Sequence, residues 1–376
     1  MATYRKLTKE EREEKNKEYE KGVAELFINA IKENKAPWQK PWKAGSSMAD
    51  YNPVTKQKNK NAKPYQGINA LYLELVREIY FQSQDPRWMT FLQVKGLNKE
   101  GQKKEDFIHV KEGEKATPIK FYTPKYLDKD GKPVPVDENG NYDRDRVVRS
   151  VPVLQTHFVF HVSQIVKDKY DENGNLLLDE NGKKQYIPAF EPIKIEEEKL
   201  NVKPLIEPDT LIKNTNVKIK HDQKDRCYYT EFDDAIHLVP KQQFKDTQNY
   251  YDTLLHELTH WTGVKKRLDR EEFQKYSDSK EWRAKEELVA EIGGYMLAKE
   301  CNINFEPTQN NISYVESWCN HIKEKPTAIF EACEKAKKAS DYIQSFTKEH
   351  KKENIHENEN ENEETENYTV TKKKSR

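Results

Sequence analysis

The stretch His256-Glu-Leu-Thr-His260 constrains the fold of this chain more than any other part of the sequence. On a helix, two histidines four residues apart lie about 40° from each other around the axis, so both imidazoles can reach one ion. Glu257 lies beside them, where its carboxylate can take a proton from a water molecule on that ion. Leu258 and Trp261 fall on another face, which can pack against the protein. The stretch predicts a helix with a metal site on one face; the alternative is a helix with two surface histidines.

A catalytic zinc site needs a third protein ligand in addition to two histidines. The stretch Trp282–Lys299 is rich in strong helix formers, and Glu287 and Glu291 share a face of that helix at a spacing of four residues. We assign Glu287 to the metal and Glu291 to a hydrogen bond that orients a ligand histidine, with Glu286 the less favoured choice. Gly293-Gly294 permits close approach of a neighbouring helix. The alternative for the acidic residues is a solvated stripe.

The composition describes a polar protein without a membrane-spanning segment. The 376 residues hold 65 basic and 65 acidic side chains, and the mean hydropathy is −1.08. This leaves enough apolar material for modest cores in two domains, with loops or tails left over. No apolar run approaches the ~18 residues of a membrane helix, and the start of the chain leads into charge. Four widely spaced cysteines are typical of reduced thiols, so we expect a cytoplasmic protein.

A basic, aromatic segment lies between Lys35 and Ile68. It contains seven lysines against one aspartate in a chain whose charges otherwise balance. Trp38, Trp42, Tyr51 and Tyr65 are interleaved with these lysines. Basic residues attract a phosphate backbone and flat rings offer stacking platforms, so the segment predicts binding to single-stranded nucleic acid. The alternative is a basic loop whose tryptophans pack in the core.

The rest of the sequence predicts a mixture of helices, strands and tight turns. Apolar spacing favours a helix that buries Leu71, Leu75 and Ile79, and further helices close the C-terminal part. Short Asp- and Asn-Gly tracts within 127–147 and 166–200 favour tight turns at hairpin tips. The expected strands are a hairpin over 107–122 that turns at Gly113, a strand over 151–162, and a pair over 227–232 and 235–240.

Several short motifs follow one another in the order found in one known family. They are Trp38-x-x-Pro41-Trp42, Tyr65-x-Gly67-Ile68-Asn69, Trp88-Met-Thr-Phe91, Lys111-x-Gly113-Glu114-Lys115, Phe160-x-Val162-x-Gln164, His256–Gly263, Arg267-Leu-Asp-Arg270 and Glu286–Glu291. Over residues 21–345 the chain resembles ArdC-type antirestriction proteins. The resemblance implies an α+β chain with an N-terminal single-stranded-DNA-binding domain followed by a zincin-like metallopeptidase domain. Such proteins are carried by conjugative plasmids, integrative elements and phages, and are associated with protecting incoming DNA from host restriction.

The motifs and the resemblance together give a set of candidate site residues. We expect one Zn²⁺ per chain on His256, His260 and Glu287, with other divalent metals possible, and Glu257 as the water-activating base. The candidate DNA-binding residues are Trp38, Lys40, Trp42, Lys43, Lys63, Tyr65, Asn69, Arg87, Trp88, Lys111 and Lys115.

The expected organisation has five parts. They are a charged segment over 1–20, the single-stranded-DNA-binding domain over 21–165 with a hairpin insertion at 127–147, an insertion and linker over 166–209, the zincin-like domain over 210–346, and a disordered tail over 347–376. Two functions stay open. The protein either shields single-stranded DNA from restriction, or it is an active zinc metallopeptidase that cleaves a host protein such as a restriction enzyme and uses DNA binding for localisation.

Overall fold

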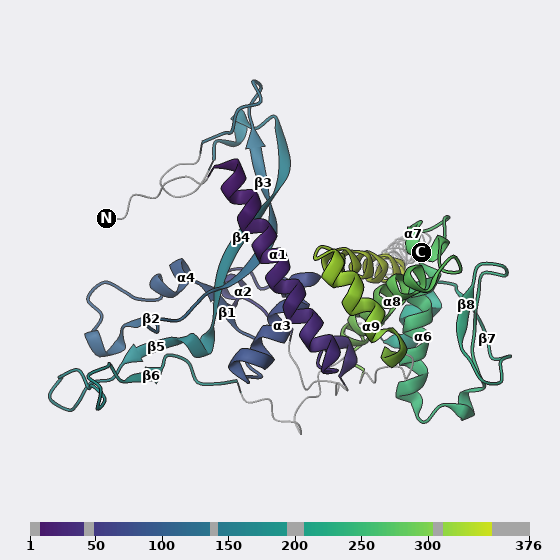
Figure 1. Ribbon diagram of the computed structural model, residues 1–376. Coiled ribbons are helices and arrows are strands. Elements are labelled where there is room, and N and C mark those ends of the chain that lie inside the picture. Colours follow the sequence, from purple (N-terminus) through teal and green to yellow (C-terminus); the bar gives the residue numbers. More distant parts are fainter. Residues whose placement is uncertain (1–7, 41–48, 136–141, 194–206, 304–310, 348–376) are drawn as a thin grey trace, which may run out of the picture. The chain divides into compact units, whose positions relative to one another are not determined.

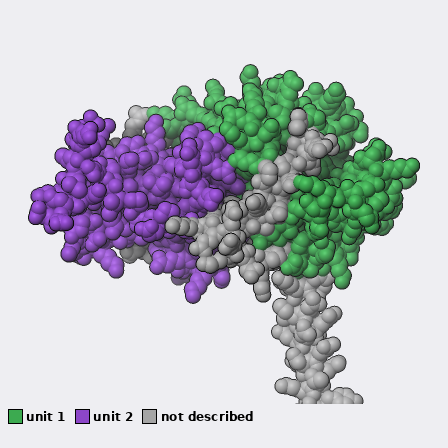
Figure 2. Space-filling view, turned by 90° about the horizontal axis from the view of Figure 1, so that it is seen from below, with its two compact units in different colours: residues 1–47, 195–376 green, residues 48–194 purple. Residues whose placement is uncertain are grey.

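The computed structural model describes residues 8–40, 49–135, 142–193, 207–303 and 311–347. The chain forms two compact units: unit 1 comprises residues 1–47 and 195–376, and unit 2 comprises residues 48–194 (Figure 2). These units divide the chain differently from the expected parts. Helix α1 (Lys9–Lys32) runs without a break across residue 20 and packs on α9 (Asn311–Glu324) in unit 1. Strand β5 (Ile165–Asp168) begins at Ile165 and runs past the expected domain boundary within unit 2.

Unit 2 is built around a long antiparallel hairpin. Strand β3 (Thr117–Leu127) pairs with β4 (Arg149–His161) from Thr117 opposite Val159 to Leu127 opposite Arg149. Strand β1 (Trp88–Thr90) adds to the other edge of β4, which gives the order β1-β4-β3. Figure 1 shows the hairpin as an extended two-stranded ribbon. The structure thus confirms the predicted strand over 151–162.

A second sheet in unit 2 corrects the predicted hairpin over 107–122. Strand β2 (Ile108–Val110) pairs with β5, which pairs with β6 (Tyr186–Pro188). The turn at Gly113 is present, with a φ of 83°. The strands on its two sides nevertheless belong to different sheets, because all 11 residues of β3 pair with β4. The local turn was predicted correctly, but the strand pairing was wrong.

The predicted tight turns are confirmed where the structure describes them. Gly131, Gly174 and Gly182 have φ values of 73°, 80° and 75°, a region that glycine adopts without steric cost. In each turn the carboxylate of the preceding Asp accepts hydrogen bonds from backbone N–H groups. The fourth tract, over 137–140, lies outside the described residues.

The described part of unit 2 contains three α-helices, α2 (Pro53–Lys58), α3 (Ile68–Phe81) and α4 (Phe91–Lys95). Helices α3 and α4 contribute buried residues, and α2 has none. Leu71 and Leu75 are buried on α3 as predicted, whereas Ile79 is 37% exposed because it lies in the last turn.

Unit 1 contains helices on a small three-stranded sheet. The sheet has the order β7-β9-β8, with β7 (Lys218–Lys220) parallel and β8 (Tyr228–Thr230) antiparallel to β9 (Ala235–His237). This confirms the predicted pair of strands and makes β8 an edge strand. The remaining helices are α5 (Pro208–Asn214), α6 (Thr247–Trp261), α7 (Glu271–Gln274), α8 (Lys280–Glu300) and a last helix over residues 328–347. Short 3₁₀ helices lie at Pro37–Gln39, Lys104–Asp106, Arg144–Arg146, Val162–Gln164 and Lys241–Gln243.

Close packing of α6 on α8 positions the candidate site. A Cβ added at Gly293 would lie 2.6 Å from Cγ2 of Thr259, and one at Gly294 would lie 3.4 Å from the backbone of His256. The two helices therefore touch at the level of the histidines, as the glycine pair predicted. Side-chain caps fix where the two helices begin, at Asp246 for α6 and at Ser279 for α8. None of the helices in the described ranges is long and apolar enough to cross a membrane.

Candidate metal centre

His256, His260 and Glu287 converge on one point between α6 and α8. The Nε2 atoms of the two histidines lie 3.1 Å apart. Oε2 of Glu287 is 3.4 Å from Nε2 of His256, and its Oε1 is 3.7 Å from Nε2 of His260. One ligand atom from each residue lies within 4.8 Å of the other two. Two imidazole nitrogens and a carboxylate oxygen are the donor types that suit Zn²⁺.

The electrostatics of this cluster favour a cation. Burial disfavours the charged imidazole of His256, but the carboxylates of Glu291 and Glu287 outweigh that effect and raise its pKa to about 10. Burial likewise disfavours the charged carboxylate of Glu287, yet the two histidines lower its pKa to about 2. The shifts arise because the imidazoles and carboxylates stabilise each other's charged forms. A divalent ion can supply the positive charge in place of a proton on the histidine.

Glu286, the less favoured choice in the sequence analysis, contacts the ring of His260, a role that was not predicted. Its side chain is fully buried, and Oε1 lies 3.0 Å from Nδ1 of His260. Arg270 donates from Nε to the other oxygen of Glu286 at 3.0 Å and from Nη2 to the carbonyl of Thr259 at 2.8 Å. This pairing fixes the ring of His260 with Nε2 towards the cluster. The signal was available in the Arg267-Leu-Asp-Arg270 motif, but its partner lies 16 residues away.

Glu291, predicted to orient a histidine, lies at the other ring. Its Oε1 is 3.5 Å from Nδ1 of His256. Nδ1 of His256 is buried and has no hydrogen-bond partner among the described residues. Glu291 therefore lies near the predicted position, but its carboxylate does not form a hydrogen bond with this ring. The ring of His256 is therefore held by fewer hydrogen bonds than that of His260.

Glu257 lines the same cavity as the three converging residues, which has a volume of about 420 Å³. Its Oε2 accepts a hydrogen bond of 2.9 Å from the backbone N–H of Tyr229 on the edge strand β8. Burial raises the pKa of Glu257, which makes its carboxylate a better proton acceptor. Tyr276 also lines the cavity and donates its hydroxyl hydrogen to Glu287. The arrangement has the parts needed to activate water beside an extended peptide on β8.

The structure moves two candidate DNA-binding tryptophans into the core. Trp38 is fully buried in unit 1 and stacks on Phe27 with ring centroids 5.8 Å apart. Trp88 is fully buried in unit 2, where its Nε1 donates to Asp50 at 2.7 Å. Neither ring has a free face on which a base can stack, so these two assignments are corrected. The alternative of a basic segment with buried tryptophans holds for Trp38. Trp42 and Lys43 lie outside the described residues.

The other candidates are scattered, and only some share a cavity. Lys63, Tyr65 and Asn69 line a second cavity, in unit 2. Asn69 is itself buried and donates to the carbonyl of Lys120 at 2.7 Å, which is a structural contact. Away from this cavity, Arg87 pairs with Asp85, Lys111 lies over the ring of Tyr186, Lys115 is exposed and Lys40 is half-buried.

Two family models match the two parts of the chain. Residues 16–160 match the N-terminal domain of the anti-restriction factor ArdC. Residues 207–335 match a zincin-like metallopeptidase domain, and they contain the converging histidines and Glu287.

Curated relatives share much of this chain. Two DNA primase TraC proteins of Escherichia coli are 33% and 31% identical over 340 and 344 residues, which is 89% and 90% of this chain. The chain spans only 28% and 20% of the length of these relatives. The uncharacterized protein y4eC of Sinorhizobium fredii (strain NBRC 101917 / NGR234) is 23% identical over 323 residues, which is 86% of this chain and 90% of that protein.

Solved structures agree with the family models. Crystal structures of the antirestriction ArdC protein from the R388 plasmid, one metal-free and one Mn(II)-bound, are 26% and 25% identical to the chain, each with a TM-score of 0.57. Both alignments cover 87% of this chain and 97% of the solved chain. The chain therefore belongs to the ArdC-type antirestriction proteins, with an ArdC N-terminal domain followed by a zincin-like metallopeptidase domain.

Proposed function

We propose that this protein binds single-stranded DNA and protects incoming DNA of a mobile genetic element from restriction in the cytoplasm of a bacterial host. The observation that carries the proposal is the ArdC N-terminal match over residues 16–160, which contains both the lysine-rich segment and the cavity of unit 2. Lysines attract the phosphates, and an open cavity with aromatic walls admits bases that are not paired. The antirestriction ArdC protein of the R388 plasmid supports the protective role.

We further propose that His256, His260 and Glu287 hold one divalent ion, with Zn²⁺ the expected metal. The Mn(II)-bound structure of the related ArdC protein supports a divalent cation, and the two-imidazole, one-carboxylate donor set favours zinc. When bound, such an ion supplies Lewis acidity and lowers the pKa of water. Glu257 is placed to accept a proton, and the N–H of Tyr229 keeps its carboxylate in position. Glu286 and Arg270 orient His260.

Proteolysis of a host protein is the second candidate function. The buried Glu257 beside the histidines favours it, because a metal site that only holds the fold together does not need a proton acceptor. The edge strand β8 beside the cavity can hold an extended peptide through its backbone. We favour protection by DNA binding, because nothing in the site identifies a protein substrate.

A restriction-protection assay with Glu257→Ala separates the two functions. The same purified variant is tested for binding of single-stranded DNA and for metal content, with Glu334→Ala, a change of an exposed glutamate on the last helix, as the control. If protection depends on DNA binding, Glu257→Ala keeps protection, metal and DNA affinity. Loss of protection with unchanged metal content, expression and DNA affinity would show that proteolysis is required.

A further inference from the structure

The cavity of unit 2 has the size and composition of a site for one flat ligand. Its volume is about 530 Å³, within the roughly 300–1,000 Å³ that small-molecule sites occupy. Its walls come from strands β3 and β4, from α2, and from the segment that leads into α3. It lies entirely within unit 2 and shares no residue with the candidate metal centre.

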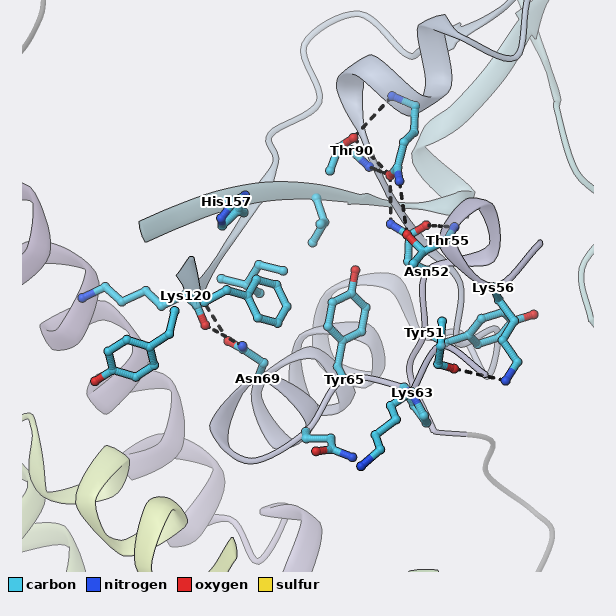
Figure 3. A pocket seen from close by; sticks show the side chains of 18 residues that line it. Tyr51, Asn52, Thr55, Lys56, Lys63, Tyr65, Asn69, Thr90, Lys120 and His157 are labelled. Atoms are coloured by element: carbon cyan, nitrogen blue, oxygen red, sulfur yellow. Dashed lines mark hydrogen bonds between the residues drawn. The ribbon is translucent and has the colours of Figure 1, made fainter. Parts of the chain in front are cut away.

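One wall of the cavity is aromatic. Tyr65 stacks against Phe121 with ring centroids 5.9 Å apart and an interplanar angle of 29°. Phe121 in turn meets the ring of His157 edge-on at 5.7 Å. Figure 3 shows the ring of Tyr65 standing in the middle of the cavity, with Asn69 and Lys120 to one side and Asn52 to the other. Burial raises the pKa of Tyr65 to about 12, so the phenol presents a neutral ring.

The facing wall carries amide and hydroxyl groups in fixed orientations. Nδ2 of Asn52 donates to Oε1 of Gln93 at 2.8 Å, and the same oxygen accepts the backbone N–H of Thr90 at 2.9 Å. Oδ1 of Asn52 accepts the backbone N–H of Thr55 at 3.0 Å. Across the cavity, Nε2 of His157 is buried and has no hydrogen-bond partner among the described residues. Fixed polar groups beside a stacking ring suit the recognition of a base edge.

The rim of the cavity is positively charged. Lys56 and Lys63 line it, and Lys58 and Lys60 lie on the same exposed segment. The sequence has no acidic residue between Asp50 and Glu74, so these charges are not balanced locally along the chain. Exposed lysines around a cavity suit the phosphates on either side of a bound nucleotide.

We propose that this cavity receives one unstacked nucleobase of single-stranded DNA, which stacks on Tyr65 while the rim lysines contact the flanking phosphates. The proposal rests on the proposed DNA binding and gives it a location. It requires a single strand, because a base paired in a duplex cannot leave the stack without the cost of unpairing. The same chemistry can take a free nucleotide, and the test separates the two sources.

The test measures binding of the full-length protein to two oligonucleotides of equal length and charge. One is oligothymidine, and the other is an abasic strand that keeps the sugars and phosphates. Wild type is expected to bind oligothymidine about tenfold more tightly, the effect of one stacked base. Tyr65→Ala should remove this preference, whereas Tyr65→Phe should keep it because the ring remains. Tyr80→Ala, which removes a 66%-exposed ring of α3 outside the cavity, is the matched control and should keep the preference.

The outcomes separate failure of this inference from failure of the proposed function. Equal binding of both strands by wild type, or an unchanged preference in a folded Tyr65→Ala protein, overturns the base site while DNA binding stands. If wild type binds neither strand, the proposed function fails as well. If thymidine monophosphate competes as strongly as the strand, the cavity serves free nucleotides and the strand proposal is overturned. Circular dichroism establishes that each variant is folded. If Tyr65→Ala is not folded, Tyr65→Leu, which fills the space without an aromatic face, takes its place and should also lose the preference.

Discussion

Neighbouring glutamates on α8 contact different groups, because a helix turns about 100° with each residue and their side chains point in different directions. Glu287 faces the two Nε2 atoms, while Glu286 points to the back of His260 and is held by Arg270. Glu291, one turn further, reaches the back of His256. The three carboxylates thus surround the histidines from different sides, which is why each should affect metal binding to a different extent.

Substitutions of these three glutamates should lower the affinity for the metal to different extents. Glu287→Ala should empty the site, because it removes a ligand. Glu286→Gln should weaken binding by about 10–100-fold, because it disturbs the ring of His260. Glu291→Gln should have the smaller effect, because its hydrogen bond to His256 is not formed. Metal analysis after dialysis against graded chelator measures the order, with Glu334→Gln as control. A site still filled in Glu287→Ala would refute the ligand assignment.

Asp234 gives a prediction for pH dependence. Burial works against its charged form, but Lys266, Arg267 and Tyr229 bind the carboxylate and lower its pKa to about 2. An unfolded aspartate has a pKa of about 3.9, so the folded state favours ionised Asp234. Its contribution is full above pH ~4 and is lost as the pH falls towards 2, and it is on the order of 1–2 kcal/mol.

Asp234→Asn should therefore be less stable than wild type at neutral pH, and the difference should shrink between pH 4 and 2. Asparagine suits the replacement because residue 234 has a φ of 53°, which Asn tolerates. Urea unfolding at a series of pH values measures the difference in the free energy of unfolding. A difference that stays constant down to pH 2 would contradict the assigned ion pairs.

Single residues also show what the sequence does not determine. The spacing of His256 and His260 follows from helix geometry alone, so local pattern was enough to place these two rings together. Glu287 comes from α8, and its position beside them depends on the packing of α6 on α8. The burial of Trp38 and Trp88 depends on partners elsewhere, Phe27 in one case and Asp50 in the other. The lysines around Trp38 are polar in either case, so the interleaved pattern over Lys35–Ile68 does not distinguish a stacking platform from a core ring.

At the scale of elements, the contact between α6 and α8 depends on Gly293. Gly293→Ala should lower the free energy of unfolding, because the new methyl group would lie 2.6 Å from the buried side chain of Thr259. Overpacking of this kind costs about 1–3 kcal/mol and exceeds the gain of about 1 kcal/mol in helix propensity. The control Gly22→Ala lies mid-helix in α1 with nothing within 4 Å of its Cβ, and should stabilise by about 0.5–1 kcal/mol. Thermal unfolding measures both; stabilisation by Gly293→Ala would mean that the helices separate easily.

Helices were predicted better than strand pairings, for a physical reason. The periodicity that identifies α3 or α8 lies within the element itself. The partner of a strand can lie anywhere in the sequence. Strand β2, for example, pairs with β5, and Ile108 lies opposite Lys167, more than 50 residues further along the chain. The turn at Gly113 satisfied every local rule for a hairpin, yet β3 pairs with β4 instead. The sequence therefore predicted the helices that carry the candidate metal ligands, and for the sheet that walls the second cavity it predicted the strand over 151–162 but not the strand pairing.

At the scale of the whole molecule, the proposed metal site and the proposed DNA site lie in different compact units. The chain has no net charge, so attraction of DNA has to come from a local concentration of lysines such as the one around the unit 2 cavity. The proposed metal ligands all lie in unit 1, and the proposed base site lies in unit 2. Each ligand is thus expected to act on a different compact unit.

Calorimetry can test this separation directly. A ligand that binds only a folded unit raises the stability of that unit by mass action. An ion between α6 and α8 would cross-link two helices of unit 1. Removing this ion with a chelator should therefore lower the temperature at which unit 1 unfolds. Single-stranded DNA should raise the other transition, and Tyr65→Ala should reduce that rise. Trp88 is the one tryptophan between residues 48 and 194, so the part of the fluorescence change that is missing in Trp88→Phe identifies the unit 2 transition. If chelator and DNA shift the same single transition, the two units unfold together and the separation does not hold.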